Sequence, residues 1–389
     1  MKKYNNKSTA KQTGTSVQRA AGFSLIELMI AMVIGLLIMS GVFQVFISSK
    51  HSDKVLQAEA EMQENARFAF SVMTNIIQQA GNFGCQASTN LVTRNAVKPP
   101  VTPNTFRPAR IIEGWEAKDT GHGDSYTTHP GSGVSLITTQ HWTSSNNATK
   151  DAGTKSKKYS DILKVWYSRP EKATLTNIDH ANSILTFSDI DLKKGDVLVI
   201  NDCRTVNFAQ VCKCEDDDCA NDDTKATIKD GVCSTPGNNP LNLHSLNMPT
   251  AEVGILDEAI FFVGKRSDST TGYQQNQPSL YVRYLGNKAK PGRKEEILEG
   301  VESLQILYGE DTNSDNSPNY YVSADKVANW KNVVSLKLSL LLRSRKNNMT
   351  SSAQALSLNG ATITLADGDR YLRRVFSTTI ALRNRTIGF

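Results

Sequence analysis

The first hydrophobic pattern in the chain is an almost unbroken apolar run that begins after Gly22 and ends at Ile47. It contains a single charged residue, Glu27, near its start. Because an α-helix rises about 1.5 Å per residue, a helix of this length crosses a hydrocarbon core about 30 Å thick. We therefore predict that residues 23–47 form a transmembrane helix or the helical core of a fibre.

The helical pattern continues after this run, with one apolar residue at every third or fourth position. Most of the charged residues lie outside one helix face. The apolar positions on that face are Met62, Ala66, Ala69, Met73, Ile76 and Ala80. Gly81 and Asn82 end the pattern, since glycine tolerates left-handed backbone geometry at a helix end. One helix is thus predicted over residues 23–80, with residues 48–80 packing against a globular head formed by residues 81–389.

The head shows short apolar runs bounded by turn residues, and residues 334–342 alternate apolar with polar side chains, as a half-buried strand does. Residues 82–160 are rich in Thr, Ser, Asn, Gly and Pro and predict loops apart from one short strand at 134–138. The other predicted strands are 162–167, 183–187, 197–200, 259–263, 280–285, 334–342 and 376–382. The expected fold is α+β, with a long N-terminal helix packed against an antiparallel β-sheet head that carries large loop insertions.

Charge is distributed unevenly along the chain. Residues 1–22 contain no acidic residue and five basic ones, Lys2, Lys3, Lys7, Lys11 and Arg19, which favours a cytoplasmic N-terminus and places the head on the opposite side of the membrane. The whole chain has 44 basic and 38 acidic residues, so removing this basic leader lowers the formal charge from +6 to +1. A near-neutral remainder gives no general reason to expect nucleic-acid binding.

Glu27 is the most informative residue of the apolar run. A carboxylate within a membrane helix costs several kcal/mol unless it is paired, so it indicates a function. A secretory signal has a shorter apolar region of about 7–15 residues, and a plain membrane anchor does not need the carboxylate. Gly22, Phe23 and Glu27 together resemble the class III signal of type IV pilins. The resemblance implies that prepilin peptidase cuts after Gly22 at the inner membrane, that Phe23 is N-methylated, and that Glu27 pairs with a neighbouring subunit's amino terminus during assembly.

Three further segments narrow the resemblance: residues 77–85, which close the helix with a cysteine, and residues 298–309 and 373–385. Together they resemble the PilW family of type IV pilus minor pilins. The resemblance implies a structural, non-enzymatic subunit that primes the pilus fibre and lies at its tip. The implied partners are other minor and major pilins and a tip adhesin. The head would be periplasmic before assembly and exposed on the cell-surface fibre afterwards. Residues 86–160 and 204–250 are not covered by the resemblance.

Two alternatives remain open. A minor pseudopilin of a type II secretion system would carry the same N-terminal pattern. A pilus-borne binding module for DNA or a host surface belongs to a different class, and its candidate surface is a basic C-terminal segment with Arg373, Arg374, Arg383 and Arg385. A solvated strand face is the simpler account of these arginines.

Six cysteines lie beyond the apolar run, in the oxidising compartment, and their even number predicts up to three disulfides. They are Cys85, Cys203, Cys212, Cys214, Cys219 and Cys233. Most of them define a disulfide-rich insertion at about 203–233. A Cys85–Cys203 bond would fasten the helix end to the sheet. The alternative is a thiolate metal site, although zinc sites usually use C-x-x-C pairs, which are absent here.

Asp311, Asn313 and Asp315 have the one-three-five oxygen spacing of a calcium loop. Two departures count against this reading, because Asn316 stands at the glycine position and Val322 at the position of the bidentate glutamate. A polar turn linking a strand to a helix is the alternative. The chain has no G-x-S-x-G, H-E-x-x-H or P-loop motif, and its histidines are scattered, so we predict no enzyme activity and no cofactor.

Overall fold

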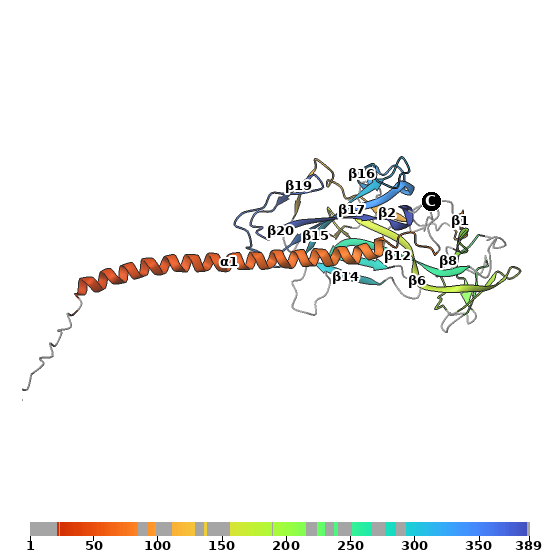
Figure 1. Cartoon of the computed structure of the whole chain (residues 1–389), viewed down its shortest axis with the longest axis horizontal. Coiled ribbons are helices and arrows are strands. Elements are labelled where there is room, and N and C mark those ends of the chain that lie inside the picture. Colours follow the sequence, from red (N-terminus) through yellow and green to blue (C-terminus); the bar gives the residue numbers. More distant parts are fainter. Residues whose placement is uncertain are drawn as a thin grey trace, which may run out of the picture. The chain divides into compact units, whose positions relative to one another are not determined.

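We describe the chain from a computed structural model, which covers residues 22, 24–84, 92–98, 111–128, 136–137, 156–188, 190–214, 224–229, 237–239, 251–265, 277–284 and 293–386. The chain divides into two compact units, Met1–Lys54 and Val55–Phe389. Each unit is described by itself. One helix, α1 (Leu25–Ile77), contributes residues to both units (Figure 1).

The part of α1 in the first unit has no buried side chain. The large apolar side chains from Leu25 to Ile47 are 51–78% exposed. By length and composition, α1 is able to cross a membrane. An exposed apolar surface of this extent marks a membrane or protein contact, since soluble monomers rarely carry one.

The part of α1 in the second unit is amphipathic. Its buried side chains recur every three or four residues, as one helix face requires: Ala58, Met62, Ala66, Ala69, Met73 and Ile77. The stripe expected from the sequence is therefore confirmed in its spacing. Ile76, which was expected in the stripe, is partly buried and packs against this core, and its neighbour Ile77 is fully buried.

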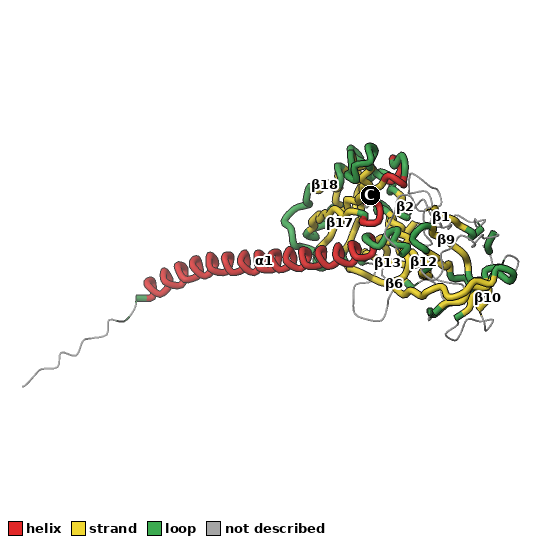
Figure 2. The backbone as a smooth tube through the Cα atoms, turned by 45° about the vertical axis from the view of Figure 1, so that its right-hand side comes forward, coloured by secondary structure: helices red, strands yellow, loops and turns green. Residues whose placement is uncertain are grey.

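The head consists of sheets that are mostly antiparallel (Figures 1 and 2), and the predicted α+β fold with a long N-terminal helix is confirmed. The large sheet has eleven strands and the second sheet has the order β16-β15-β17-β20, while β18-β19-β3 and β4-β5 form smaller sheets. Among the described strands, two pairs are parallel, β1 with β9 and β19 with β3. The strands of the large sheet are β1 (Val92–Asn95), β2 (Ile112–Trp115), β6 (Ile162–Asp179), β7 (Ile184–Phe187), β8 (Val197–Asn201), β9 (Thr205–Gln210), β10 (Lys213–Cys214), β11 (Lys225–Thr227), β12 (Glu252–Lys265), β13 (Pro278–Tyr284) and β14 (Lys294–Glu299).

The remaining elements belong to the smaller sheets and to short helical turns. They are β3 (Ser125–Thr128), β4 (Leu136–Ile137), β5 (Ser156–Lys157), β15 (Val301–Glu310), β16 (Tyr320–Val322), η1 (Ala324–Lys326), η2 (Trp330–Asn332), β17 (Val333–Arg343), β18 (Leu356–Leu358), β19 (Ala361–Leu365), β20 (Arg373–Ala381) and α3 (Arg383–Thr386). The strands β1, β2 and β3 fall in residues 82–160, where the sequence analysis expected mainly loops. That expectation was wrong, because short strands pair with distant segments and need no strong local pattern.

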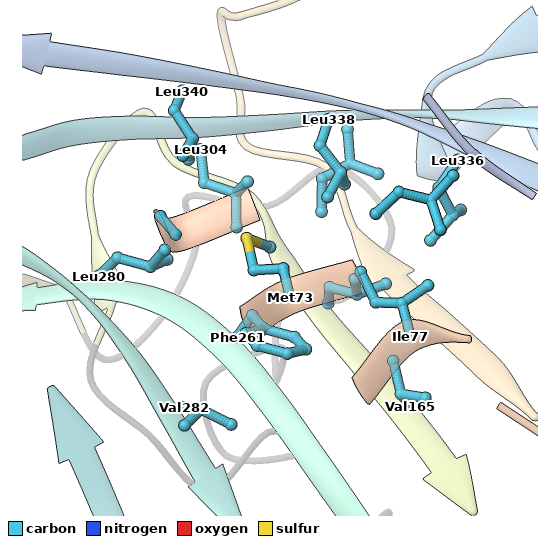
Figure 3. Close-up of a cluster of buried hydrophobic side chains, with 14 of the residues drawn as sticks. Met73, Ile77, Val165, Phe261, Leu280, Val282, Leu304, Leu336, Leu338 and Leu340 are labelled. Carbon is cyan, nitrogen blue, oxygen red and sulfur yellow. The ribbon is translucent and has the colours of Figure 1, made fainter. Parts of the chain in front are cut away.

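The main core lies where α1 meets side chains of both larger sheets. Figure 3 shows Met73 and Ile77 among Phe261 and Leu280 from the large sheet and Leu338 from β17. The helix therefore covers an apolar layer that neither sheet buries alone.

β17 is the central strand of the second sheet and is buried on both faces. Only Lys337 is exposed along its length, although the sequence predicted one polar face. The second face is covered because Leu341 packs into a small cluster with β19 residues such as Ile363. Ser339 is buried there and lies 2.8 Å from the Ser377 hydroxyl.

Candidate functional site

The first turn of α1 is closed by two side chains that hydrogen-bond in opposite directions. The Ser24 hydroxyl accepts a hydrogen bond from the Ile26 N–H at 3.2 Å. The Glu27 carboxylate accepts one from the Ser24 N–H at 3.1 Å. This reciprocal arrangement is a capping box, and it satisfies two backbone donors that a helix start leaves without partners.

This capping role was not predicted, although its sequence signal is the S-x-x-E spacing of Ser24 and Glu27. The carboxylate lies against the backbone of Ser24, which is the second residue after the predicted cut at Gly22. Gly22, Ser24 and Glu27 are all exposed. Phe23, the predicted methylation site, lies outside the described residues. The helix start thus holds the Glu27 carboxylate against Ser24, which follows the predicted new amino terminus in sequence.

Within the second unit, α1 is fastened to the head by charged and polar contacts near both ends of its packed part. Glu59 forms an ion pair with Arg374, and Glu61 lies 3.3 Å from the Arg345 guanidinium. At the other end, Asn384 Nδ2 donates to the Ala80 carbonyl at 2.9 Å. This amide caps a helix end whose last carbonyls have no partner within the helix.

A buried cluster of charged side chains joins β15, β17 and β20. The Arg373 guanidinium bonds to both oxygens of Glu302, at 2.7 and 3.0 Å, and to both oxygens of Asp369, each at 2.7 Å. Arg343 bonds to Glu302 at 3.2 Å. Burial acts to raise the pKa of Glu302, but Lys157, Arg373 and Arg343 outweigh it and lower that pKa to about 2.

The idea that Arg373 belongs to a basic binding surface was wrong. Its side chain is 0% exposed and is fully engaged with carboxylates. Arg374 is exposed but paired with Glu59, so it serves the contact with the helix. Arg383 is exposed, and the side chain of Arg385 lies outside the described residues. The simpler account, a solvated strand face, also fails for Arg373.

A second buried cluster is acidic and lies where β2, β6 and β15 come together. Asp161 accepts hydrogen bonds from the Ala117 N–H at 2.9 Å and the Ile306 N–H at 2.8 Å. Burial, reinforced by the nearby Asp325 carboxylate, raises the pKa of Glu116 to about 7. Burial and the neighbouring Glu116 carboxylate raise the pKa of Asp161 as well. These carboxyls link segments of the head and titrate with pH.

The loop after β15 is organised around Asp311. Its carboxylate accepts hydrogen bonds from the backbone N–H groups of Asn313, Ser314 and Asn316, at 3.1, 2.6 and 2.8 Å. Although desolvation raises the pKa of Asp311, these N–H donors lower it overall. The loop joins β15 to β16, so the turn links two strands and not a strand to a helix as the sequence analysis supposed.

Calcium binding at Asp311, Asn313 and Asp315 stays a prediction. Asn313 Nδ2 donates to Asp315 at 3.0 Å, so these side chains already stabilise the turn through one another. Among the described residues, no group of three or more His, Cys, Asp or Glu side chains is arranged to hold a metal ion.

Three cysteines of the insertion are disulfide-bonded: Cys203, Cys212 and Cys214. Oxidised sulfurs are not thiolate ligands, which counts against the metal alternative for Cys212 and Cys214. Cys85, Cys219 and Cys233 lie outside the described residues, so the Cys85–Cys203 bond and the rest of the pairing stay predictions. Asn201 Nδ2 donates to the Phe83 carbonyl at 2.9 Å, which brings the segment before Cys203 against the segment after α1.

The chain matches two family models. Residues 260–384 match the family described as type IV pilus-assembly protein W, and residues 17–43 match the prokaryotic N-terminal methylation motif. No curated protein and no solved structure matches the chain. The first match covers the end of β12 and the strands β13 to β20, and the second covers the start of α1 with Glu27. The resemblance to both families is therefore confirmed, and it supports a type IV pilus-associated minor pilin, a structural class of protein.

Proposed function

We propose that this protein is a structural minor pilin that is needed to build the type IV pilus, primes the fibre and sits at its tip. Its partners there are other minor and major pilins and a tip adhesin. The observation that carries the proposal is the helix start, where an exposed apolar helix holds Glu27 beside the predicted cleavage position. The matches to the assembly-protein family and to the methylation motif support it.

The proposed sequence of events follows from this arrangement. Before assembly, α1 is inserted in the inner membrane with its basic leader in the cytoplasm and its head in the periplasm. Prepilin peptidase removes residues 1–22, and Phe23 becomes an N-methylated amino terminus. The Glu27 carboxylate then pairs with the terminal ammonium of a neighbouring subunit, since a buried carboxylate and a buried ammonium each lower the cost of the other.

The test is a Glu27→Ala variant of the full-length chain in cells that lack the wild-type copy. We expect surface pili to fall at least about tenfold, because loss of one buried partner costs several kcal/mol. Glu64→Ala is the matched control, since Glu64 is an exposed glutamate of the same helix. Normal piliation of the Glu27→Ala cells would contradict the proposal. Lost type II secretion with normal pili would instead favour the pseudopilin, and lost DNA uptake with normal pili would favour the binding module.

A further inference from the structure

The second sheet ends at β20, which pairs only with β17 among the described strands. The two strands run in unbroken register from Arg343↔Arg373 to Ser335↔Ala381. Just beyond β20, the Leu382 N–H donates to the Val334 carbonyl at 2.8 Å. Since bonding alternates along an antiparallel pair, the even-numbered residues of β20 bond to β17. The odd-numbered residues therefore point their N–H and C=O groups away from the sheet.

One end of this outer edge is closed by a side chain. The Arg373 N–H donates to Gln354 Oε1 at 2.8 Å, and Gln354 Nε2 donates to the Arg373 carbonyl at 3.4 Å. The amide thus occupies the place of a strand residue, which confirms that the backbone N–H and C=O groups of Arg373 point away from β17. For the next outward residues, Val375, Ser377 and Thr379, the described part of the chain supplies no partner to the backbone N–H and C=O groups.

Two other edge strands of these sheets, β14 and β16, are protected in ways that β20 is not. The edge strand β14 carries Lys294, Glu295, Glu296 and Glu299, and its register with β13 shifts between Leu280 and Tyr281. The edge strand β16 is only three residues long. Charges, bulges and shortness are the usual means of preventing strand addition. β20 contains no lysine and no proline, and its two arginines are bonded to Glu302, Asp369 and Glu59.

We propose that the open edge of β20, from Val375 to Thr379, receives an extended strand from a neighbouring pilus subunit. This inference rests on the proposed function, which supplies such a neighbour. An unpaired row of backbone groups is best satisfied by another extended backbone, as in β-strand addition. β20 also runs alongside the packed part of α1, because Arg374 contacts Glu59 and Asn384 caps Ala80.

The two faces of β20 specify the chemistry of the incoming strand. Phe376 is only partly buried and packs into the core with α1, so it offers apolar contact to a strand laid beside it. On the opposite face, exposed Thr379 lies across from exposed Lys337 of β17. The complementary strand therefore alternates apolar side chains on the helix side with small polar or acidic side chains on the Lys337 side.

The test compares two substitutions at one position of the full-length chain in pilus-forming cells. Thr379→Pro removes an outward N–H without touching the bonds to β17, and proline is tolerated on edge strands. Thr379→Ala keeps the N–H and is the matched control. Thr379→Glu is a second blocking variant, because it copies the glutamates seen on β14 and repels acidic side chains of the incoming strand. A benzophenone side chain placed at exposed Ala381 captures the neighbour, and mass spectrometry identifies the captured chain.

We expect capture of a different subunit that carries an N-methylated amino terminus. Thr379→Pro should lower this capture at least about tenfold, which corresponds to the loss of one or two hydrogen bonds. Thr379→Glu keeps the N–H and should lower the capture through its charge. Thr379→Ala should stay within about twofold. Unchanged capture in both blocking variants, or capture of a second copy of this chain, would overturn the inference. If Glu27→Ala abolishes pili while the blocking variants change neither pili nor capture, only the edge inference fails. If Glu27→Ala cells are normally piliated, the proposed function itself fails.

Discussion

The two halves of α1 have similar helical geometry but opposite relations to the rest of the chain. From Leu25 to Lys54 every side chain is exposed, including the large apolar ones. From Val55 to Ile77 the apolar stripe is buried in the head core. The first half is thus built for contacts outside the chain, whereas the second half completes a core within it. Substitutions in the two halves, and in the elements that each contacts, should therefore affect different measurements.

The largest effect on the second unit is expected from Arg373→Met. This change leaves Glu302 and Asp369 without their main buried partner, which should lower the free energy of unfolding by about 3–5 kcal/mol. Thermal or denaturant unfolding of the full-length protein in detergent measures the change. Arg374→Met is the matched control, because the neighbouring exposed ion pair with Glu59 should contribute at most about 1 kcal/mol. Equal effects of the two variants would show that the buried cluster does not stabilise the head.

A smaller effect is expected from the acidic cluster and depends on pH. The pKa of Glu116 is raised to about 7, so between about pH 4.5 and 7 the folded state holds a proton that the unfolded state has lost. Stability should therefore fall as pH rises through this window, by about 1–3 kcal/mol. The pKa of Glu302 is lowered to about 2, so its contribution is lost only below this window. Unfolding at a series of pH values should show the fall in the wild type and a smaller fall in Glu116→Gln, because burial still raises the pKa of Asp161 in that variant.

The smallest effect separates the two roles of the helix start. Ser24→Ala removes the hydroxyl that caps α1 but leaves the Glu27 carboxylate, and it should cost about 1 kcal/mol of local helix stability. We expect faster amide exchange in the first turn, unchanged unfolding of the head and retained piliation. A loss of pili equal to that of Glu27→Ala would mean that capping, and not intersubunit pairing, is what assembly requires from this glutamate.

The sequence was sufficient for features that repeat locally. The long helix, its apolar stripe and strands such as β17 and β20 follow from periodicity, because each residue's environment depends on its own position in the element. Long-range features were not predictable in this way. β17 is buried on both faces because β19 and its neighbours cover the second face, and the residue pattern of β17 itself does not predict this contact.

The candidate site shows the same limit. Glu27 was identifiable because a carboxylate in an apolar run is costly. Its capping partner Ser24 was not predicted, although the S-x-x-E spacing signals it. The fate of Arg373 was not readable, since its carboxylate partner Glu302 is 71 residues away in sequence. A group of arginines near the C-terminus looks the same in the sequence whether the side chains bind a partner or are buried in ion pairs.

The Asn384 cap on the Ala80 carbonyl has a consequence for how the protein is made. The two residues are separated by 304 positions, so the ribosome delivers the helix long before it delivers the cap. During that interval the end of α1 has open carbonyls and its apolar stripe lacks β17 and β20, which are also synthesised late. The sequence of α1 is therefore complete well before the last strands of the head are made. The head therefore completes its folding around a helix that was synthesised first.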